Sequence, residues 1–176
     1  QRVKLIYICS PNNPTGTSFP HDQIKSLCEE LDGQSIVILD ETYAEFSSAG
    51  SMSAHLESLP NLIILRTLSK SYSMAGMRMG CFLSGDPDFV AMVKSKALDA
   101  YPLPRASVEA ALHVLSDEIR EIAQANIQKI LTERTRITET LKASPHITHI
   151  YPRDANFLLI EMNHASEFIQ HATQNN

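Results

Sequence analysis

The sequence predicts an α/β fold built on a mostly parallel sheet. Short runs of Ile, Leu and Val recur along the first half of the chain and alternate with a stretch of helical periodicity. These runs are nearly continuous in apolar residues, which is typical of strands that are covered on both faces. The order strand, helix, strand, loop, strand indicates a layered sheet with crossover connections.

Four strands and one helix are expected in the first half of the chain. The strands are predicted at Leu5–Cys9, Ile36–Leu39, Leu62–Leu65 and Cys81–Ser84. The helix is predicted at Asp22–Leu31, because its apolar residues recur on one face, and Gly33 suits the end of a helix.

From Asp86 onward the pattern becomes mainly helical. Helices are expected at Pro87–Leu98 and Arg105–Leu115, separated by a break that contains Pro102 and Pro104. Ser116 is expected to cap a long helix that runs to about Leu141. The predicted buried side of this helix consists of Ile119, Ile122, Ala123, Ile127, Ile130 and Leu141. Strands at Ile147–Tyr151 and Asn156–Met162 and a short helix at Ala165–Thr173 complete the predicted elements.

Composition excludes several classes of partner. The chain has 176 residues and a net charge of −5, without a basic cluster, so nucleic acid is not an expected partner. No apolar run approaches the roughly 20 residues that cross a bilayer, so no membrane association is expected. The three cysteines are scattered, which favours buried thiols in a reducing cytoplasm. The seven histidines show no metal-binding spacing, and no metal is expected. Because the chain begins at Gln1, almost directly with a strand, we expect an internal fragment.

Polar residues stand where three of the predicted strands end. Asn13 follows the first strand, Asp40 closes the second, and Thr67 to Lys70 follow the third. Ligands of open α/β sheets bind beyond the carboxyl ends of the strands. The three segments are therefore expected to converge on one edge of the sheet.

Lys70 lies in the most informative of these segments. Thr67 and Ser69 precede it, and Arg78 follows eight residues later. This combination suits a phosphate-bearing aldehyde, because the lysine amine can condense with the aldehyde while the hydroxyls and the guanidinium hold the phosphate. Glycines nearby are expected to permit a tight turn, a close backbone approach or a positive φ, namely Gly16, Gly76 and Gly80.

Three segments, taken in order, resemble the fold type I aminotransferases, which use pyridoxal 5′-phosphate (PLP). They are Ser10-Pro11-Asn12-Asn13-Pro14-Thr15-Gly16, Leu39-Asp40-Glu41-Thr42-Tyr43 and the stretch from Arg66 to Gly80. The resemblance implies the α/β fold of PLP-dependent transferases of fold type I. It also implies that residues 1–115 are part of a large PLP-binding domain, and that residues 116–176 are a hinge helix and the start of a small α+β C-terminal domain.

The resemblance also implies a role for each site residue. Lys70 would be the catalytic amine that condenses with PLP and moves a proton, and Asp40 would bond the pyridine nitrogen and keep the ring protonated. Asn13 and Tyr43 would donate to the ring oxygen of the cofactor. Thr67, Ser69 and Arg78 would hold its phosphate. Glu41, next to Asp40, is expected to point elsewhere.

Two further segments, Ala100–Pro104 and Tyr151–Leu159, resemble histidinol-phosphate aminotransferases. This implies amino transfer between L-histidinol phosphate and 2-oxoglutarate, in histidine biosynthesis, by a cytoplasmic homodimer. Thr42 departs from the usual pattern, in which Ala is common. Other segments that the family uses to hold cofactor and substrate have no counterpart in residues 1–176, so these residues alone are expected to bind PLP weakly.

Three alternatives remain open at this point. The first is an aromatic or aspartate-type aminotransferase, and the second is a threonine-phosphate decarboxylase, both of the same PLP-dependent lineage. The third is a regulatory domain that senses PLP without catalysing a reaction.

Overall fold

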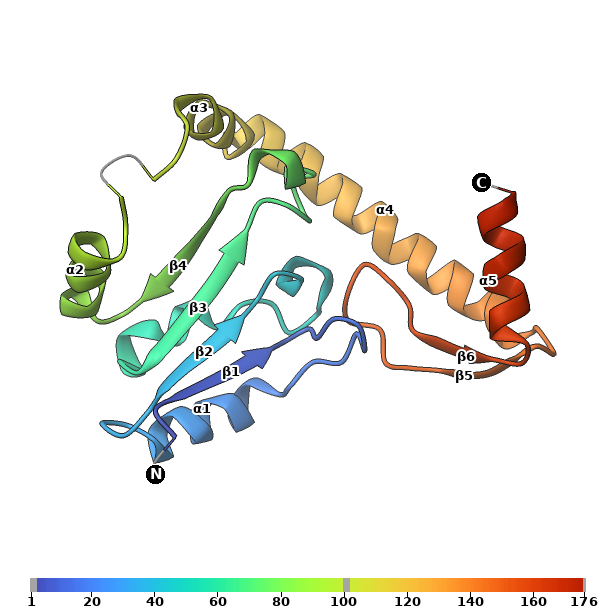
Figure 1. The fold of residues 1–176 in the computed structure, drawn as a ribbon, viewed down its shortest axis with the longest axis horizontal. Coiled ribbons are helices and arrows are strands. Elements are labelled where there is room, and N and C mark those ends of the chain that lie inside the picture. The colour runs from blue at the N-terminus through green and yellow to red at the C-terminus, as the bar shows by residue number, and fades with distance from the viewer. Residues whose placement is uncertain (1–2, 100–101, 176) are drawn as a thin grey trace.

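A four-stranded sheet forms the first half of the molecule. The computed structural model describes residues 3–99 and 102–175 (Figure 1). The strands lie in the order β1-β2-β3-β4, with β1 parallel to β2, β2 parallel to β3, and β3 antiparallel to β4. Their bounds are Leu5–Cys9 (β1), Ile36–Asp40 (β2), Leu62–Thr67 (β3) and Gly80–Ser84 (β4), which confirms the four predicted strands.

One face of this sheet carries the main hydrophobic core. Helix α1 (His21–Glu30) and a 3₁₀ helix (Met52–Ser58) pack against this face. The buried cluster consists of Ile24, Cys28, Val37, Leu39, Met52, Leu59, Leu62 and Ile64. The members from β2 and β3 are alternate residues, because successive side chains of a strand point to opposite faces.

The opposite face of the sheet is open near β1, which corrects the prediction that the strands are covered on both faces. Leu5 is 54% exposed and Tyr7 is 55% exposed. Both residues alternate with Ile6 and Ile8, which are less exposed. In the part of the chain that the structure describes, α1 and the 3₁₀ helix cover only the other face, so apolar composition alone overstated the burial of β1.

The second half is mainly helical, as predicted. Its elements are α2 (Pro87–Lys96), α3 (Arg105–Val114), α4 (Asp117–Lys142), β5 (Ile147–Ile150), β6 (Ile160–Met162) and α5 (Ala165–Gln174). Strands β5 and β6 pair antiparallel in a second, two-stranded sheet. The long helix α4 runs from the neighbourhood of α3 to this small sheet (Figure 1). Ala100 and Tyr101, which belong to the predicted break, lie outside the described residues.

Several details of this half differ from the prediction. Strand β6 begins at Ile160 instead of Asn156, and in the segment before it the Phe157 ring packs edge-on against the Tyr43 ring. Ser116 directly precedes α4 as expected, but its side chain makes no capping hydrogen bond. On α4 Ala123 is buried, whereas Ile122 and Ile130 are 51% and 38% exposed. A helix that contacts the rest of the chain along a narrow stripe leaves the flanks of its apolar face uncovered.

The cysteines also depart from the expectation of three buried thiols. Cys28 is buried under the sheet and Cys9 is partly buried, but Cys81 on β4 is exposed. No helix within residues 3–99 and 102–175 combines the length and the apolar character that crossing a membrane requires.

The two halves of the molecule meet at a second small core. Tyr43, Phe46 and Ala155 are buried there, and residues of α4 pack against them. Arg134 of α4 donates from one guanidinium nitrogen to the carbonyls of Phe46, at 3.1 Å, and Ala155, at 2.6 Å. The backbone N–H of Asp154 donates to the carbonyl of Gly16 at 2.8 Å. The loop that contains Asn13 is therefore braced by the segment between β5 and β6.

Candidate functional site

Three of the predicted site residues come together beyond the carboxyl ends of β1, β2 and β3. The Nδ2 atom of Asn13 donates to the Tyr43 hydroxyl at 2.9 Å. The Lys70 Nζ atom lies 5.6 Å from the centre of the Tyr43 ring. Tyr43 is buried, while Lys70 is exposed at the surface of the site. The expected convergence of the three segments on one sheet edge is thus present, because the Asn13 amide and the Lys70 amine both lie next to Tyr43.

Asp40 ends β2 at the same edge and accepts hydrogen bonds on both carboxylate oxygens. Oδ1 accepts from the Thr42 backbone N–H at 2.9 Å and from the Thr42 hydroxyl at 2.6 Å. Oδ2 accepts from the Tyr7 hydroxyl. Tyr7 pairs with Ile38 in the parallel register, so it lies diagonally across from Asp40 on the open face. A long aromatic side chain such as that of Tyr7 can span this diagonal. The bond to Asp40, together with burial and the nearby negative charge, raises the pKa of Tyr7 to about 12.

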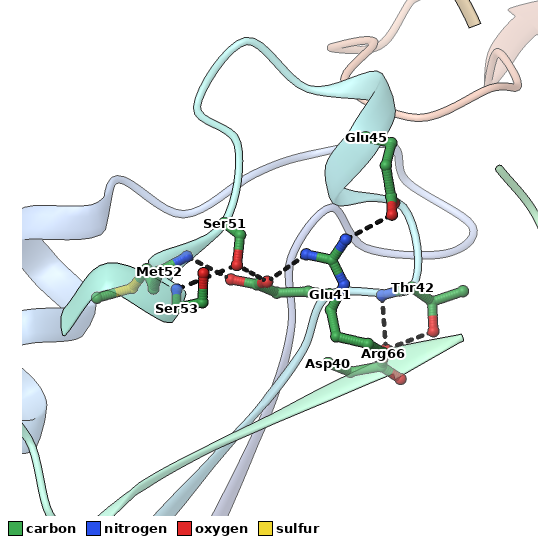
Figure 2. Close-up of polar contacts among 8 residues, drawn as sticks. All are labelled: Asp40, Glu41, Thr42, Glu45, Ser51, Met52, Ser53 and Arg66. Carbon is green, nitrogen blue, oxygen red and sulfur yellow. Dashed lines mark hydrogen bonds and ion pairs between the residues drawn. The ribbon is translucent and has the colours of Figure 1, made fainter. Parts of the chain in front are cut away.

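Glu41 points away from Asp40, as predicted, because the two residues are neighbours at a strand end and take opposite faces (Figure 2). Its side chain is 1% exposed and forms an ion pair with Arg66 of β3 at 3.0 Å. The carboxylate also accepts from the Met52 backbone N–H at 2.7 Å and from the Ser51 hydroxyl at 2.5 Å. Arg66 pairs with Glu45 as well.

The electrostatics of Arg66 reflect this pairing. Burial on its own lowers the pKa of Arg66, but the carboxylates of Glu45 and Glu41 more than offset this effect, so its pKa is raised above the ordinary value. The pair fixes the segment from Asp40 to Tyr43 relative to β3. Sequence reasoning assigned no role to this ion pair.

The residues expected to hold a phosphate are only partly assembled. The Thr67 hydroxyl lies 2.9 Å from the Ser69 hydroxyl and 3.0 Å from the Met79 carbonyl, and the Ser69 backbone N–H donates to the Thr67 hydroxyl at 3.1 Å. Arg78 lies in the same loop but is exposed, with a left-handed φ of 53°. Its guanidinium donates to the Ala75 carbonyl at 2.9 Å, within its own turn.

The glycine predictions separate into two that are confirmed and one that is wrong. Gly16 has a φ of +71° and closes the turn with a 2.8 Å hydrogen bond from its N–H to the Asn12 carbonyl. A Cβ atom at Gly80 would lie 2.8 Å from the Arg66 carbonyl, so the close backbone approach is real. Gly76 has neither property: it lies in an exposed 3₁₀ turn, no atom lies within 4 Å of an added Cβ, and its φ is not positive.

Sequence reasoning missed two residues that contact Asp40. The sequence patterns indicate no role for Tyr7, and Thr42 differs from the common pattern only in replacing Ala. The alternation of β1 places Tyr7 on the face that Asp40 shares, but the register of β1 on β2 is needed to bring them together. Across the ranges 3–99 and 102–175, no group of three or more His, Cys, Asp or Glu residues is placed to hold a metal ion.

An amine, a fixed carboxylate and a hydroxyl–amide pair thus lie at one edge of the sheet. A family model described as "Aminotransferase class I and II" matches residues 1–175. The chain therefore belongs to the aminotransferase class I and II family, in agreement with the fold type expected from its motifs.

Individual relatives share one name. The chain is 38% identical to "Histidinol-phosphate aminotransferase 2" of Idiomarina loihiensis over 98% of its length, which corresponds to 47% of that protein. It is 36% identical to "Histidinol-phosphate aminotransferase" of Pectobacterium carotovorum over 90% of its length and 44% of that protein. The chain thus spans about half the length of the curated relatives it matches.

Solved structures agree with this placement. A histidinol-phosphate aminotransferase of Sinorhizobium meliloti, in complex with pyridoxal-5′-phosphate, superposes with a TM-score of 0.80 at 28% identity, covering 94% of this chain and 44% of that one. The histidinol-phosphate aminotransferase of Clostridium acetobutylicum has a TM-score of 0.86 at 22% identity, covering 98% of this chain and 52% of that one. The second similarity concerns the fold alone.

Proposed function

We propose that the protein, at its full natural length, is a PLP-dependent aminotransferase that transfers an amino group between L-histidinol phosphate and 2-oxoglutarate. The observation that carries this proposal is the placement of Lys70, Tyr43 and Asn13 around one point of the sheet edge that Asp40 closes. The shared name of the relatives supports the choice of substrates.

The side chains present fit PLP in chemical type. When bound, PLP supplies an electron sink, which the protein orients and tunes. Asp40 would accept from the ring nitrogen, Asn13 and Tyr43 would donate to the ring oxygen, and Lys70 would condense with the aldehyde. The paired hydroxyls of Thr67 and Ser69, together with Arg78, would hold the phosphate. The close approach of backbone at Gly80 keeps the loop that carries these donors compact.

Three of these residues would have separate tasks when PLP is bound. Lys70 would supply the amine that holds the aldehyde, and its Nζ would be the group placed to accept and return the proton of the substrate carbon. The Lys70 Nζ atom lies over the face of the Tyr43 ring, where a cation–π contact can orient it. Asn13 donates to the Tyr43 hydroxyl, which fixes the direction of that hydroxyl.

The proposal extends to domains and assembly. We assign residues 1–115 to part of the large PLP-binding domain and residues 116–176 to the hinge helix and the start of the small domain. The separation of the β1–β4 sheet from the β5–β6 sheet supports this division. A cytoplasmic homodimer acting on a small amino donor and a 2-oxo acid completes the proposal, and light scattering on the purified full-length protein tests the dimer.

A borohydride trap tests the role of Lys70. The full-length protein is incubated with PLP, reduced and digested, and the pyridoxyl mass is mapped by mass spectrometry. The label is expected only on the peptide that contains Lys70, and Lys70→Arg, which keeps the charge, should lose it. Label scattered over surface lysines, with none at Lys70, would refute the assignment.

Substrate choice needs a separate assay of the same protein. Amino transfer to 2-oxoglutarate is measured with L-histidinol phosphate, an aromatic amino acid and L-aspartate as donors, and carbon dioxide release is measured with L-threonine phosphate. L-Histidinol phosphate is expected to give the highest kcat/KM. A higher value for any other donor would assign the protein to one of the alternatives.

A further inference from the structure

The strongest unassigned feature is the set of donors around Asp40. We propose that Thr42 is a positioning residue whose hydroxyl fixes the Asp40 carboxylate so that its remaining acceptor position receives the ring N–H of the cofactor. This inference rests on the proposed function, because it concerns how the same site recognises PLP.

The hydrogen-bond count around Asp40 supports this assignment. An ionised carboxylate offers about four acceptor positions. The Thr42 N–H and hydroxyl, at 2.9 and 2.6 Å, occupy both positions on Oδ1. The Tyr7 hydroxyl occupies one position on Oδ2. One position remains, on Oδ2, and a ring N–H is a donor that matches it.

The contribution of the Thr42 side chain is separable from that of its backbone. Any residue except proline at position 42 would keep the backbone N–H bond to Asp40, and the Thr42 hydroxyl adds a second bond to the same oxygen. Two bonds from one residue to one oxygen restrain rotation of the carboxylate more than either bond alone.

This arrangement predicts a specific chemical dependence. Removing the Thr42 hydroxyl should weaken recognition of the ring nitrogen, and it should leave the contacts of the phosphate, the ring oxygen and Lys70 unchanged. A deaza analogue of PLP, in which a carbon atom replaces the ring nitrogen, lacks the group that Asp40 binds. Binding of this analogue should therefore not depend on the Thr42 hydroxyl.

The experiment measures the Kd of PLP and of the deaza analogue by absorbance titration of the full-length protein and two variants. Thr42→Val removes the hydroxyl with little change of shape, and Thr42→Ser keeps it. We expect Thr42→Val to weaken PLP binding about threefold to tenfold, a part of what a hydrogen bond to a charged group contributes. Its affinity for the analogue should be unchanged, and Thr42→Ser should match the unmodified protein for both ligands.

Two outcomes would overturn the inference alone. Equal weakening of PLP and analogue in Thr42→Val would assign the hydroxyl a general structural role, and unchanged PLP binding would assign it none. If the borohydride trap finds no PLP label on Lys70 in the protein without substitutions, the proposed function and this inference are both overturned. Because the analogue carries the same aldehyde, its binding also verifies that each variant is folded.

Discussion

At the scale of single residues, the pKa of Tyr7 is a measurable sign of its contact with Asp40. Its hydroxyl donates to Asp40, and this bond is the largest cause of the rise in its pKa from 10.0 to about 12. A raised pKa means that the protonated phenol is favoured in the folded protein. The stabilisation from this bond is therefore fully present below about pH 10 and is lost as the pH rises through about 12.

An ultraviolet titration of tyrosinate tests this prediction. The difference between the unmodified protein and Tyr7→Phe isolates the titration of Tyr7, which is expected near pH 12. The comparison is repeated with Asp40→Ala in both proteins. The pKa of Tyr7 should then lie nearer its ordinary value, because both the hydrogen bond and the negative charge are absent. Titration of Tyr7 at the ordinary value in the unmodified protein would contradict the contact.

At the scale of elements, the ion pair between Glu41 and Arg66 joins the end of β2 to β3. Glu41 is 1% exposed, and losing one partner of a buried pair leaves the other charge uncompensated. Glu41→Gln is therefore expected to lower the free energy of unfolding by about 3 kcal/mol. Arg66 keeps Glu45 as a second partner, which limits the loss. Urea denaturation of the full-length protein measures the change.

An exposed ion pair of the same chain provides the control for this measurement. Arg105 and Glu109 pair across one turn of α3 at 2.7 Å, with side chains that are 91% and 62% exposed. Solvent screening reduces such a pair to about 0.3–0.5 kcal/mol, so Glu109→Gln should be nearly neutral. A similar decrease in the free energy of unfolding for Glu41→Gln and Glu109→Gln would show that the buried ion pair of Glu41 stabilises the fold no more than an exposed one.

At the scale of the whole molecule, Gly16 joins the site loop to the segment between β5 and β6. Its carbonyl accepts from Asp154, and a Cβ atom added to it would lie 2.8 Å from the Pro152 carbonyl. Gly16→Ala should lower the free energy of unfolding by about 1–2 kcal/mol because of the φ of +71°. The contact with the Pro152 carbonyl should lower it by about a further 1–3 kcal/mol. Denaturation of the variant measures the sum.

Gly33 separates the two contributions. It has a φ of +66°, but no atom lies within 4 Å of an added Cβ. Gly33→Ala should therefore show only the backbone cost of about 1–2 kcal/mol. Equal losses at Gly16 and Gly33 would mean that the site loop and the β5–β6 segment are not in the close contact seen here.

The same three scales separate what could be predicted from what could not. Local patterns predicted the strands, the helices and the turn at Gly16, because apolar periodicity and turn-forming residues act over a few neighbours. They also placed Asn13, Asp40 and Lys70 at one edge, because parallel strands end on the same side. The burial of α4 was only partly predicted, since Ile122 and Ile130 have the right period but remain 51% and 38% exposed.

The sequence by itself therefore determined the fold class, the order of the elements and the edge at which the site forms. Only the tertiary structure decided the contacts within that site. The hydroxyl of Tyr7 reaches Asp40 because of the register of β1 on β2, and a slip of one residue would turn it to the other face. Glu41 meets Arg66 across 25 positions of sequence. Gly80 approaches backbone while Gly76 does not, because contacts between distant segments depend on packing that no local pattern encodes.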